Sequence, residues 1–215
     1  MKLRWVGHSC FIITAKSGLS IITDPYHTEQ GVNYAPVREM AAIVTVSHDH
    51  FDHNAVQSVG GKPEVVRSSG TKTVKGIEFR GIACYHDESG GKKRGENIIF
   101  CFTVDGIKLC HLGDLGHALS SEQIKEIGEV DILLIPVGGF FTIDAATATR
   151  VCDEIKPKVV VPMHYKTAQL NFPITGVDAF LAEKKNIKKL DSSVVELEPE
   201  MLPETTGILI FRPSS

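Results

Sequence analysis

The sequence predicts an α/β (α+β) protein, and two observations support this fold class. Short apolar runs dominate the first half of the 215-residue chain, and in the second half such runs alternate with helix-like segments. Two of the runs, residues 97–104 and 130–137, are apolar almost throughout, as expected of strands that are covered on both faces. Two facing sheets with helices outside would cover them, and so would one large central sheet.

The predicted strands are short and are separated by glycines or polar turns. Residues 71–85 are expected to form a hairpin with Gly76 at its turn. Residues 25–40 carry two prolines and a glycine and predict a long irregular loop, which in a compact domain is usually functional or mobile. The other predicted strands are residues 2–6, 10–14, 19–23, 41–46, 63–66, 97–104, 107–112, 130–137 and 158–163.

The predicted helices lie mainly in the second half of the chain. Ser120 followed by Gln123 is a capping-box pattern that starts a helix, and Gly128 is a residue that typically ends one. Asp144 precedes apolar side chains at helical spacing, which indicates a second helix. The predicted helices are residues 120–128, 144–155, a weaker one at 177–185, and one that starts near Asn54.

The composition is that of an ordinary globular protein, with 42% hydrophobic and 23% charged residues. The formal net charge of −3 does not suggest binding to nucleic acid through phosphate contacts. The first residues lack the features of a signal peptide and no apolar run reaches membrane-spanning length, so we expect a cytoplasmic protein without a membrane partner. The five cysteines form no CxxC pair and are interpreted as small buried side chains, so any metal site should use nitrogen and oxygen ligands.

Four apolar runs each end in a side chain that can bind a metal ion. His48 follows the run at 41–46, and His86, Asp114 and His164 follow three later runs. Strand ends that meet at one edge of a sheet form a natural crevice for a ligand. One such ending is ordinary, because a histidine at a strand end is usually a cap, but four of them indicate a shared site.

The segment VSHDHFDH, residues 46–53, concentrates these side chains further. In an extended chain His48, His50 and Asp52 point to the same side, and His53 follows where the chain turns. Histidine and carboxylate ligands without cysteine suit Zn²⁺ or Mn²⁺, with Fe²⁺ or Ni²⁺ as alternatives. One short loop cannot easily wrap a single ion with all four groups, so two ions about 3.5–4 Å apart with a bridging carboxylate would use them better.

These residues resemble the metallo-β-lactamase superfamily, whose H-x-H-x-D-H motif occurs here as S-H-D-H-F-D-H. The resemblance covers nearly the whole chain and is closest to the ascorbate-6-phosphate lactonase-like (UPF0173-type) branch. It implies a four-layer αββα sandwich, residues 1–215 forming one domain, with the metal site at the edge of two sheets. The supporting motifs, in order, are GHSCF, TDP, ACYHD, HLGDLGH, GGFFTID and PMHYKT.

The resemblance assigns roles to the matching residues. A water molecule between two ions would be the nucleophile, with its pKa lowered towards neutrality. A histidine at position 50, where diiron oxidoreductases of the superfamily have glutamate, favours hydrolysis over redox chemistry. The implied ligands are His48, His50 and His86 for the first ion, Asp52, His53 and His164 for the second, and Asp114 as the bridge, with Asp24 steadying the histidine loop.

Several residues near these motifs are candidates for proton transfer or substrate contact. Asp52 and His8 are the candidates for moving a proton, and Tyr165 and Arg94 are candidates for binding substrate. The basic loop at 90–95 would suit a phosphate or carboxylate, or it is a solvated hairpin tip. Two further histidines have open roles: His27, in the long loop, could contact substrate or be solvated, and His117 is expected at the surface.

The leading hypothesis is a metal-dependent hydrolase that opens an ester, lactone, amide or phosphoester bond in a small, acidic or phosphorylated metabolite. The family cleaves many substrates with nearly the same ligands, so the substrate follows less directly than the chemistry. Two alternatives stay open: a nuclease or phosphodiesterase of the same superfamily, and a metal-binding protein without catalytic activity. The resemblance also leaves a homo-oligomer open as the state of assembly.

Overall fold

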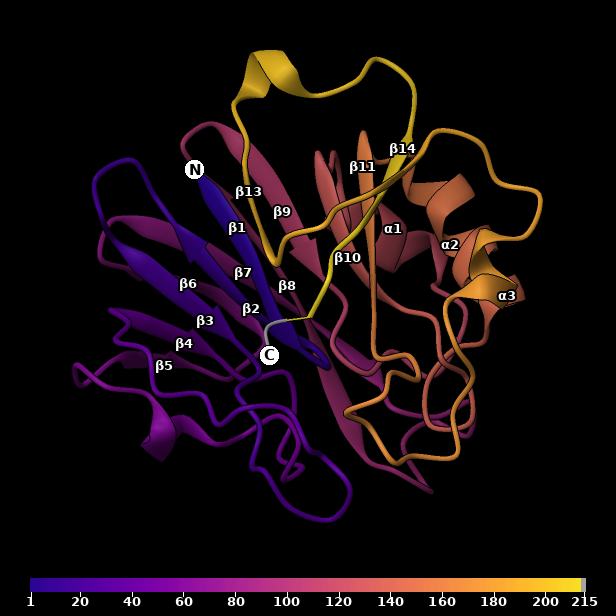
Figure 1. Cartoon of the computed structure of the whole chain (residues 1–215), viewed down its shortest axis with the longest axis horizontal. Helices are drawn as coiled ribbons and strands as arrows, with labels where there is room; N and C mark the ends of the chain where they lie inside the picture. The colour runs from indigo at the N-terminus through magenta and orange to yellow at the C-terminus, as the bar shows by residue number, and fades with distance from the viewer. Residues whose placement is uncertain (214–215) are drawn as a thin grey trace.

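The computed structural model describes residues 1–213 and contains two β-sheets that pack face to face (Figure 1). The N-terminal strands, in indigo and purple, form the sheet at the left, and the helices lie on the outer side of the other sheet at the right. The predicted α/β (α+β) class is therefore confirmed, and of the two arrangements left open the chain adopts two facing sheets. Residues 214–215, the end of the predicted 1–215 domain, lie outside the described residues.

The first sheet has six strands in the order β13-β1-β2-β3-β4-β5. Strands β1, β2 and β3 are antiparallel neighbours, whereas β3, β4 and β5 run parallel. The edge strand β13 was not predicted, because its short run is only partly buried and gives no apolar pattern. The bounds are β1 Lys2–Gly7, β2 Cys10–Thr14, β3 Ser20–Thr23, β4 Ile43–Thr45, β5 Glu64–Val66 and β13 Val194–Glu196.

The second sheet has eight strands in the order β12-β14-β11-β10-β9-β8-β7-β6. The predicted hairpin is confirmed: Lys75 and Gly76 join β6 to β7 with the two positive φ angles, 50° and 81°, that a tight hairpin turn requires. Strands β12 and β14 near the C-terminus were not predicted. The bounds are β6 Gly70–Val74, β7 Ile77–Tyr85, β8 Glu96–Val104, β9 Ile107–His111, β10 Ile132–Pro136, β11 Val159–Met163, β12 Ile187–Lys189 and β14 Gly207–Ile210.

Two of the predicted helices form nearly as expected. Ser120 accepts the backbone N–H of Gln123, and Gln123 reciprocates, so the capping box is confirmed. The helix expected near Asn54 is wrong, because only a single 3₁₀ turn forms there, and the helix expected at 177–185 is limited to four residues. The bounds are α1 Ser121–Ile127, α2 Ala145–Ile155, α3 Asp178–Leu181, η1 Val56–Ser58 and η2 Pro199–Met201.

The space between the sheets is filled by one apolar cluster. It joins Phe11 and Ile13 from the first sheet with Phe79 and Phe100 from the second, all of them fully buried. Alternate residues of β2 belong to different clusters, because successive side chains of a strand point to opposite faces. Each such side chain contributes roughly 1.5–3 kcal/mol by its removal from water, so the two sheets form a rigid base for the loops at their edge.

The outer face of the six-stranded sheet is covered mainly by irregular chain. The loop predicted at 25–40 lies over it and buries Tyr34 and Val37 against Ile12 and Val44 of the sheet. The layer on this side of the sandwich is therefore loop and a single 3₁₀ turn, whereas α-helices cover the outer side of the eight-stranded sheet.

The strand ends named in the sequence meet at one edge of the two sheets. His86 and His164 directly follow β7 and β11, and His48 and Asp114 come shortly after β4 and β9. Parallel strands present their carboxyl ends on the same side, and the turn after β1 adds His8 to that edge. The expectation of one shared crevice follows directly from this topology.

One expectation from the composition is also confirmed. All five cysteines are buried and free, as expected, although Cys101 and Cys110 lie on neighbouring strands with their Sγ atoms 3.6 Å apart. Within residues 1–213, the helices are all too short or too polar to cross a lipid bilayer.

We predict that Gly116→Ala destabilises the protein by roughly 1–3 kcal/mol, because an added Cβ would overlap the backbone of His86 and Asp87. Gly116 N–H also donates to Tyr85 O at 3.0 Å, so the chain at Gly116 cannot move away from the chain at 85–87 without losing a hydrogen bond. The matched control is Gly176→Ala, whose Cβ meets open space and should change stability by less than about 0.5 kcal/mol. Urea unfolding measures both, and equal midpoints would contradict the close packing.

Candidate metal centre

The histidine segment after β4 is held in place by Asp24, which follows β3 and is fully buried. Asp24 Oδ1 accepts the N–H of Ser47 at 2.8 Å, and Oδ2 accepts the Ser47 hydroxyl at 2.6 Å and His53 Nδ1–H at 2.9 Å. Ser47 Oγ in turn accepts Nδ1–H of His48 at 3.0 Å. Both imidazoles therefore use Nδ1 as a donor, which leaves the Nε2 lone pair free to bind a cation.

One oxygen of Asp114 lies among imidazoles from separate strand ends. Asp114 Oδ2 is 3.1 Å from Nε2 of His164, 3.2 Å from Nε2 of His86 and 3.2 Å from Nε2 of His53. The Asp114 backbone N–H donates to Asn97 Oδ1 at 3.0 Å, which fixes the turn that carries the carboxylate. Three nitrogens and one carboxylate oxygen thus converge in a buried space.

These contacts fit a metal ion better than a set of hydrogen bonds. His53 Nε2 and Asp114 Oδ1 are buried and have no hydrogen-bond partner among residues 1–213. Buried polar atoms without partners are rare, because each loses its water without compensation. A divalent cation would take these lone pairs, and imidazole nitrogen with carboxylate oxygen is a donor set that suits Zn²⁺ or Mn²⁺.

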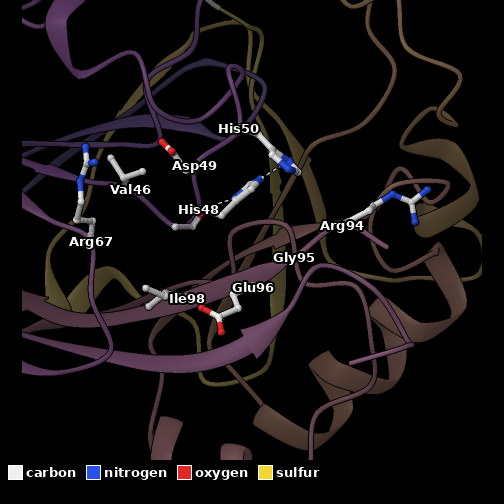
Figure 2. A pocket seen from close by; sticks show the side chains of 10 residues that line it. Val46, His48, Asp49, His50, Arg67, Arg94, Gly95, Glu96 and Ile98 are labelled. Carbon is white, nitrogen blue, oxygen red and sulfur yellow. Dashed lines mark hydrogen bonds between the residues drawn. The ribbon is translucent and has the colours of Figure 1, made fainter. Parts of the chain in front are cut away.

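A first group of possible ligands consists of His48, His50 and His86. Their ligand atoms all lie within 4.8 Å of one another. His48 Nε2 is 3.1 Å from His50 Nδ1, and the two rings stand next to each other in Figure 2. His50 is exposed whereas the other two are buried, so this group opens to solvent on the side of His50.

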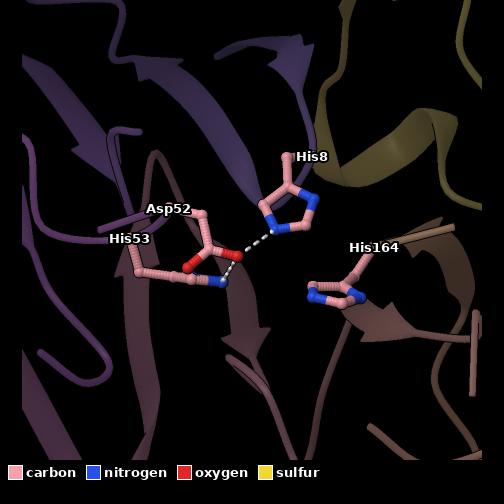
Figure 3. A group of neighbouring side chains, drawn as sticks. All are labelled: His8, Asp52, His53 and His164. Carbon is pink, nitrogen blue, oxygen red and sulfur yellow. Dashed lines mark hydrogen bonds and ion pairs between the residues drawn. The ribbon is translucent and has the colours of Figure 1, made fainter. Parts of the chain in front are cut away.

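A second group consists of His8, Asp52, His53 and His164, whose ligand atoms also lie within 4.8 Å of one another (Figure 3). His8 Nε2 donates to Asp52 Oδ2 at 3.1 Å, and His53 Nε2 lies 3.7 Å from the same oxygen. Figure 3 shows the Asp52 carboxylate between His8 and His53, with His164 across from them. The segment after β4 therefore contributes to both groups.

The electrostatics of the two groups favour a bound positive charge. Burial acts to raise the pKa of Asp114, but His164 and His53 outweigh it and hold this pKa well below its usual range. Burial acts to lower the pKa of His53, but Asp114 and Asp52 outweigh it and raise this pKa well above its usual value. The pocket thus keeps its carboxylates ionised and favours a positive charge on the nitrogen between them, a proton that a metal ion would replace.

His8 is set apart from the other histidines by its surroundings. Burial and the neighbouring His164 lower the pKa of His8 to about 4, against the hydrogen bond to Asp52, so the ring is neutral near pH 7. Its backbone has a φ of 53°, and its carbonyl accepts Nε1–H of Trp5 at 3.0 Å. A neutral imidazole held against a carboxylate is a proton acceptor in a defined position.

The metal centre opens into a cleft made of two adjoining hollows of about 660 and 360 Å³. His50 and Arg94 line both hollows, and Figure 2 shows Arg94 on the far side of the histidines from Arg67. The larger hollow is also lined by His86, Lys93 and the rings of Phe51, Phe141 and Phe172.

Comparison with known proteins places this geometry in a family. The model of the β-lactamase superfamily domain matches residues 2–164. The chain belongs to the metallo-β-lactamase superfamily. A UPF0173 metal-dependent hydrolase of Thermoplasma acidophilum is 29% identical over 79% of this chain and 85% of its own. One of Archaeoglobus fulgidus is 28% identical over 93% of this chain and 96% of its own.

A solved structure of the superfamily is more similar still. A protein of Thermotoga maritima, assigned as a Zn-dependent hydrolase of the metallo-β-lactamase superfamily, is 37% identical, covers 99% of both chains and has a TM-score of 0.84. The metallo-β-lactamase fold expected from the motifs is therefore confirmed, and so is membership of a family whose relatives are named metal-dependent hydrolases.

The structure brings together all seven residues that the superfamily motif predicts as ligands. Asp24 also lies where predicted, in contact with His53, and His8 lies beside Asp52. Their roles as ligands, support and proton carrier stay predictions. The seven residues are His48, His50, Asp52, His53, His86, Asp114 and His164.

Other residues of this superfamily site were missed in the sequence. Ser47 links Asp24 to His48, and Asn97 joins Asp114 N–H to the carbonyl of Leu112. The serine immediately precedes the histidine motif, which was the only local signal. Asn97 begins an apolar strand and carries no signal, because its role depends on pairing between distant strands.

Three further candidates lie away from the cluster. Tyr165 is buried and packs on the Trp5 ring at 5.4 Å between centroids, instead of lining the cleft. His27 contacts Gln57 in an exposed position, and His117 accepts the backbone N–H of Tyr85 outside the metal centre. Proximity in the sequence to a predicted metal ligand therefore does not by itself place a side chain in the cleft.

We predict that Asp24→Asn weakens binding of Zn²⁺ or Mn²⁺ by about 10–100-fold, because a carboxamide has one acceptor oxygen for the three donors that Asp24 accepts. The matched control is Asp49→Asn, an exposed carboxylate on the same segment whose one hydrogen bond within the described residues is from Asn54. Competition with a chromophoric chelator measures the affinity. Equal affinities for both variants would show that Asp24 does not orient the ligands.

Proposed function

We propose that the protein is a hydrolase that uses one or two divalent ions, Zn²⁺ or Mn²⁺, to cleave an ester, lactone or phosphoester bond in a small, acidic or phosphorylated substrate. The observation that carries this proposal is the convergence of three histidine nitrogens within 3.1–3.2 Å of Asp114 Oδ2. That arrangement opens directly into a cleft that is large enough for a small molecule.

The ligand sets follow from the two groups of side chains. His48, His50 and His86 would hold one ion, and Asp114 would lie between the two sites. Asp52, His53 and His164 would hold the other. When bound, the ions would supply Lewis-acid chemistry, which lowers the pKa of water and polarises the oxygen of the bond to be broken.

The chain itself provides a path for the proton. Asp52 Oδ2 and His8 Nε2 are hydrogen-bonded at 3.1 Å, and the low pKa of His8 leaves its ring neutral. The attacking water loses a proton to Asp52 or His8, and the same pair returns a proton to the leaving-group oxygen. In the described part of the chain His8 Nδ1 has no hydrogen-bond partner, so the ring can accept the proton there without breaking another contact.

The cationic side chains that line the cleft support the proposal of an acidic substrate. Lys93 and Arg94 line the larger hollow together with His50 and His86. A nuclease would need a basic face long enough to follow a phosphate backbone, and the net charge of −3 does not favour one. The expectations of a cytoplasmic protein and of a homo-oligomer stay predictions.

We predict that protein purified without chelator carries about two ions per chain and that His50→Ala and His164→Ala each lose about one. Metal analysis of the folded protein measures the content, and circular dichroism checks that each variant is folded. His117→Ala is the matched control, because this histidine lies outside both groups. A parent protein with no ion, even after Zn²⁺ or Mn²⁺ is added, would contradict the proposed function.

We further predict that the metal-loaded protein hydrolyses members of a panel of aryl esters, lactones and phosphodiesters. His8→Gln should lower kcat by about 100-fold with little change in KM, because general acid–base groups contribute roughly 10²–10⁴-fold. Steady-state kinetics of the parent and the variant provide the measurement. A protein that holds its ions but turns over no member of the panel would support the alternative of a metal-binding protein without catalytic activity.

A further inference from the structure

The loop between β7 and β8 is built around one carboxylate, that of Asp87. Asp87 Oδ1 accepts the backbone N–H of Ser89 at 2.7 Å and of Gly91 at 3.1 Å. Oδ2 accepts the backbone N–H of Lys93 at 2.9 Å and of Arg94 at 2.8 Å. Four hydrogen bonds on one buried carboxylate give the loop a defined shape in place of a mobile hairpin tip.

This arrangement satisfies the carboxylate without using the cationic side chains beside it. In the described part of the chain, neither Lys93 nor Arg94 forms an ion pair. The two acids that line the same large hollow have other partners: Asp49 accepts from Asn54, and Asp52 accepts from His8. Both cations therefore line the cleft with their charges available to a ligand.

Arg94 is held over an aromatic ring. Its guanidinium carbon lies 5.4 Å from the centroid of Phe141, a cation–π contact that fixes its direction. The ring centroid of Phe172 lies 5.7 Å from that of Phe141 and 6.4 Å from that of Phe51. These three rings form a continuous, partly exposed wall of the same hollow. An aromatic wall that faces water is typical of a surface that a ligand covers.

We propose that Asp87, Lys93 and Arg94 form an anion clamp, and that the ligand of this cleft carries an oxyanion group on a flat apolar body. The oxyanion binds Lys93 and Arg94, and the body lies on the rings of Phe141 and Phe172. Asp87 is a positioning residue, because its four hydrogen bonds are all accepted from backbone N–H groups of its own loop, including those of Lys93 and Arg94. That this ligand is a substrate rests on the proposed function, whereas its binding does not.

Isothermal titration calorimetry of the metal-loaded protein with three probes tests the clamp. Benzenesulfonate has both parts, methanesulfonate lacks the ring, and methyl phenyl sulfone lacks the charge. Sulfonates coordinate divalent ions weakly, so the probes report on the cleft and not on the metal ligands. We expect benzenesulfonate to bind at least tenfold more tightly than either partial probe.

Variants separate the parts of the clamp. Arg94→Gln should weaken benzenesulfonate about tenfold and leave methyl phenyl sulfone unchanged, and Phe141→Leu should weaken both ring-bearing probes. Lys92→Gln is the matched control, because this cation lies on the same loop but lines neither hollow. A benzenesulfonate affinity that Arg94→Gln leaves unchanged would overturn the proposal, and so would binding no tighter than that of methyl phenyl sulfone.

Asp87→Asn tests whether Asp87 positions Lys93 and Arg94. It should weaken benzenesulfonate but not the neutral sulfone. In a variant that already carries both Lys93→Gln and Arg94→Gln, it should weaken benzenesulfonate no further. A merely structural role would weaken all probes and add to the other two substitutions. If Asp87→Asn does not fold, Arg94→Gln still decides the clamp. If the protein binds benzenesulfonate as expected but hydrolyses no member of the ester, lactone and phosphodiester panel, only the proposed function is contradicted. If benzenesulfonate binding requires the ions but does not require Arg94, only the clamp is contradicted.

Discussion

The site depends on one buried carboxylate, that of Asp24, more than on any of the possible ligands. It joins the end of β3 to the segment after β4 through Ser47, and it sets the donor nitrogen of both His48 and His53. Burial acts to raise the pKa of Asp24, but His111, His53 and the hydrogen bonds outweigh it, so the group stays charged. A charged acceptor in a low-dielectric interior holds its donors firmly.

The same edge of the sandwich holds its backbone in an unfavourable conformation. His8, Asp24 and His164 have φ angles of 53°, 39° and 49°, in the left-handed region that side chains rarely adopt. Such residues cost roughly 1 kcal/mol or more each, and persist only where the surroundings hold them. Here the two sheets and their shared core do so, because each of these residues lies directly next to a buried strand. The strain turns the side chains towards one point instead of along the strands.

Charge is separated across the cleft. The carboxylates of Asp52 and Asp114 are buried among imidazoles, whereas Lys93 is exposed and Arg94 half-buried where they line the cleft. If these cations faced the buried carboxylates, they would compete with a metal ion for the same oxygens. Asp87 shapes the loop through backbone N–H groups and leaves the side chains of the two cations to the cleft. In the proposed clamp, recognition and chemistry therefore use different charges of the same pocket.

The sequence by itself determined the fold family and the residues that gather at the site. The H-x-H-x-D-H segment, the polar residues at strand ends and the capping box at Ser120 are local patterns, and each reports on its own surroundings. Only the tertiary structure showed that Asn97, Asp87 and Phe172 belong to the same site, and that Tyr165 packs on Trp5 instead. The reason is physical: these roles depend on contacts between strands and loops that are far apart in the chain, and no local pattern encodes such contacts.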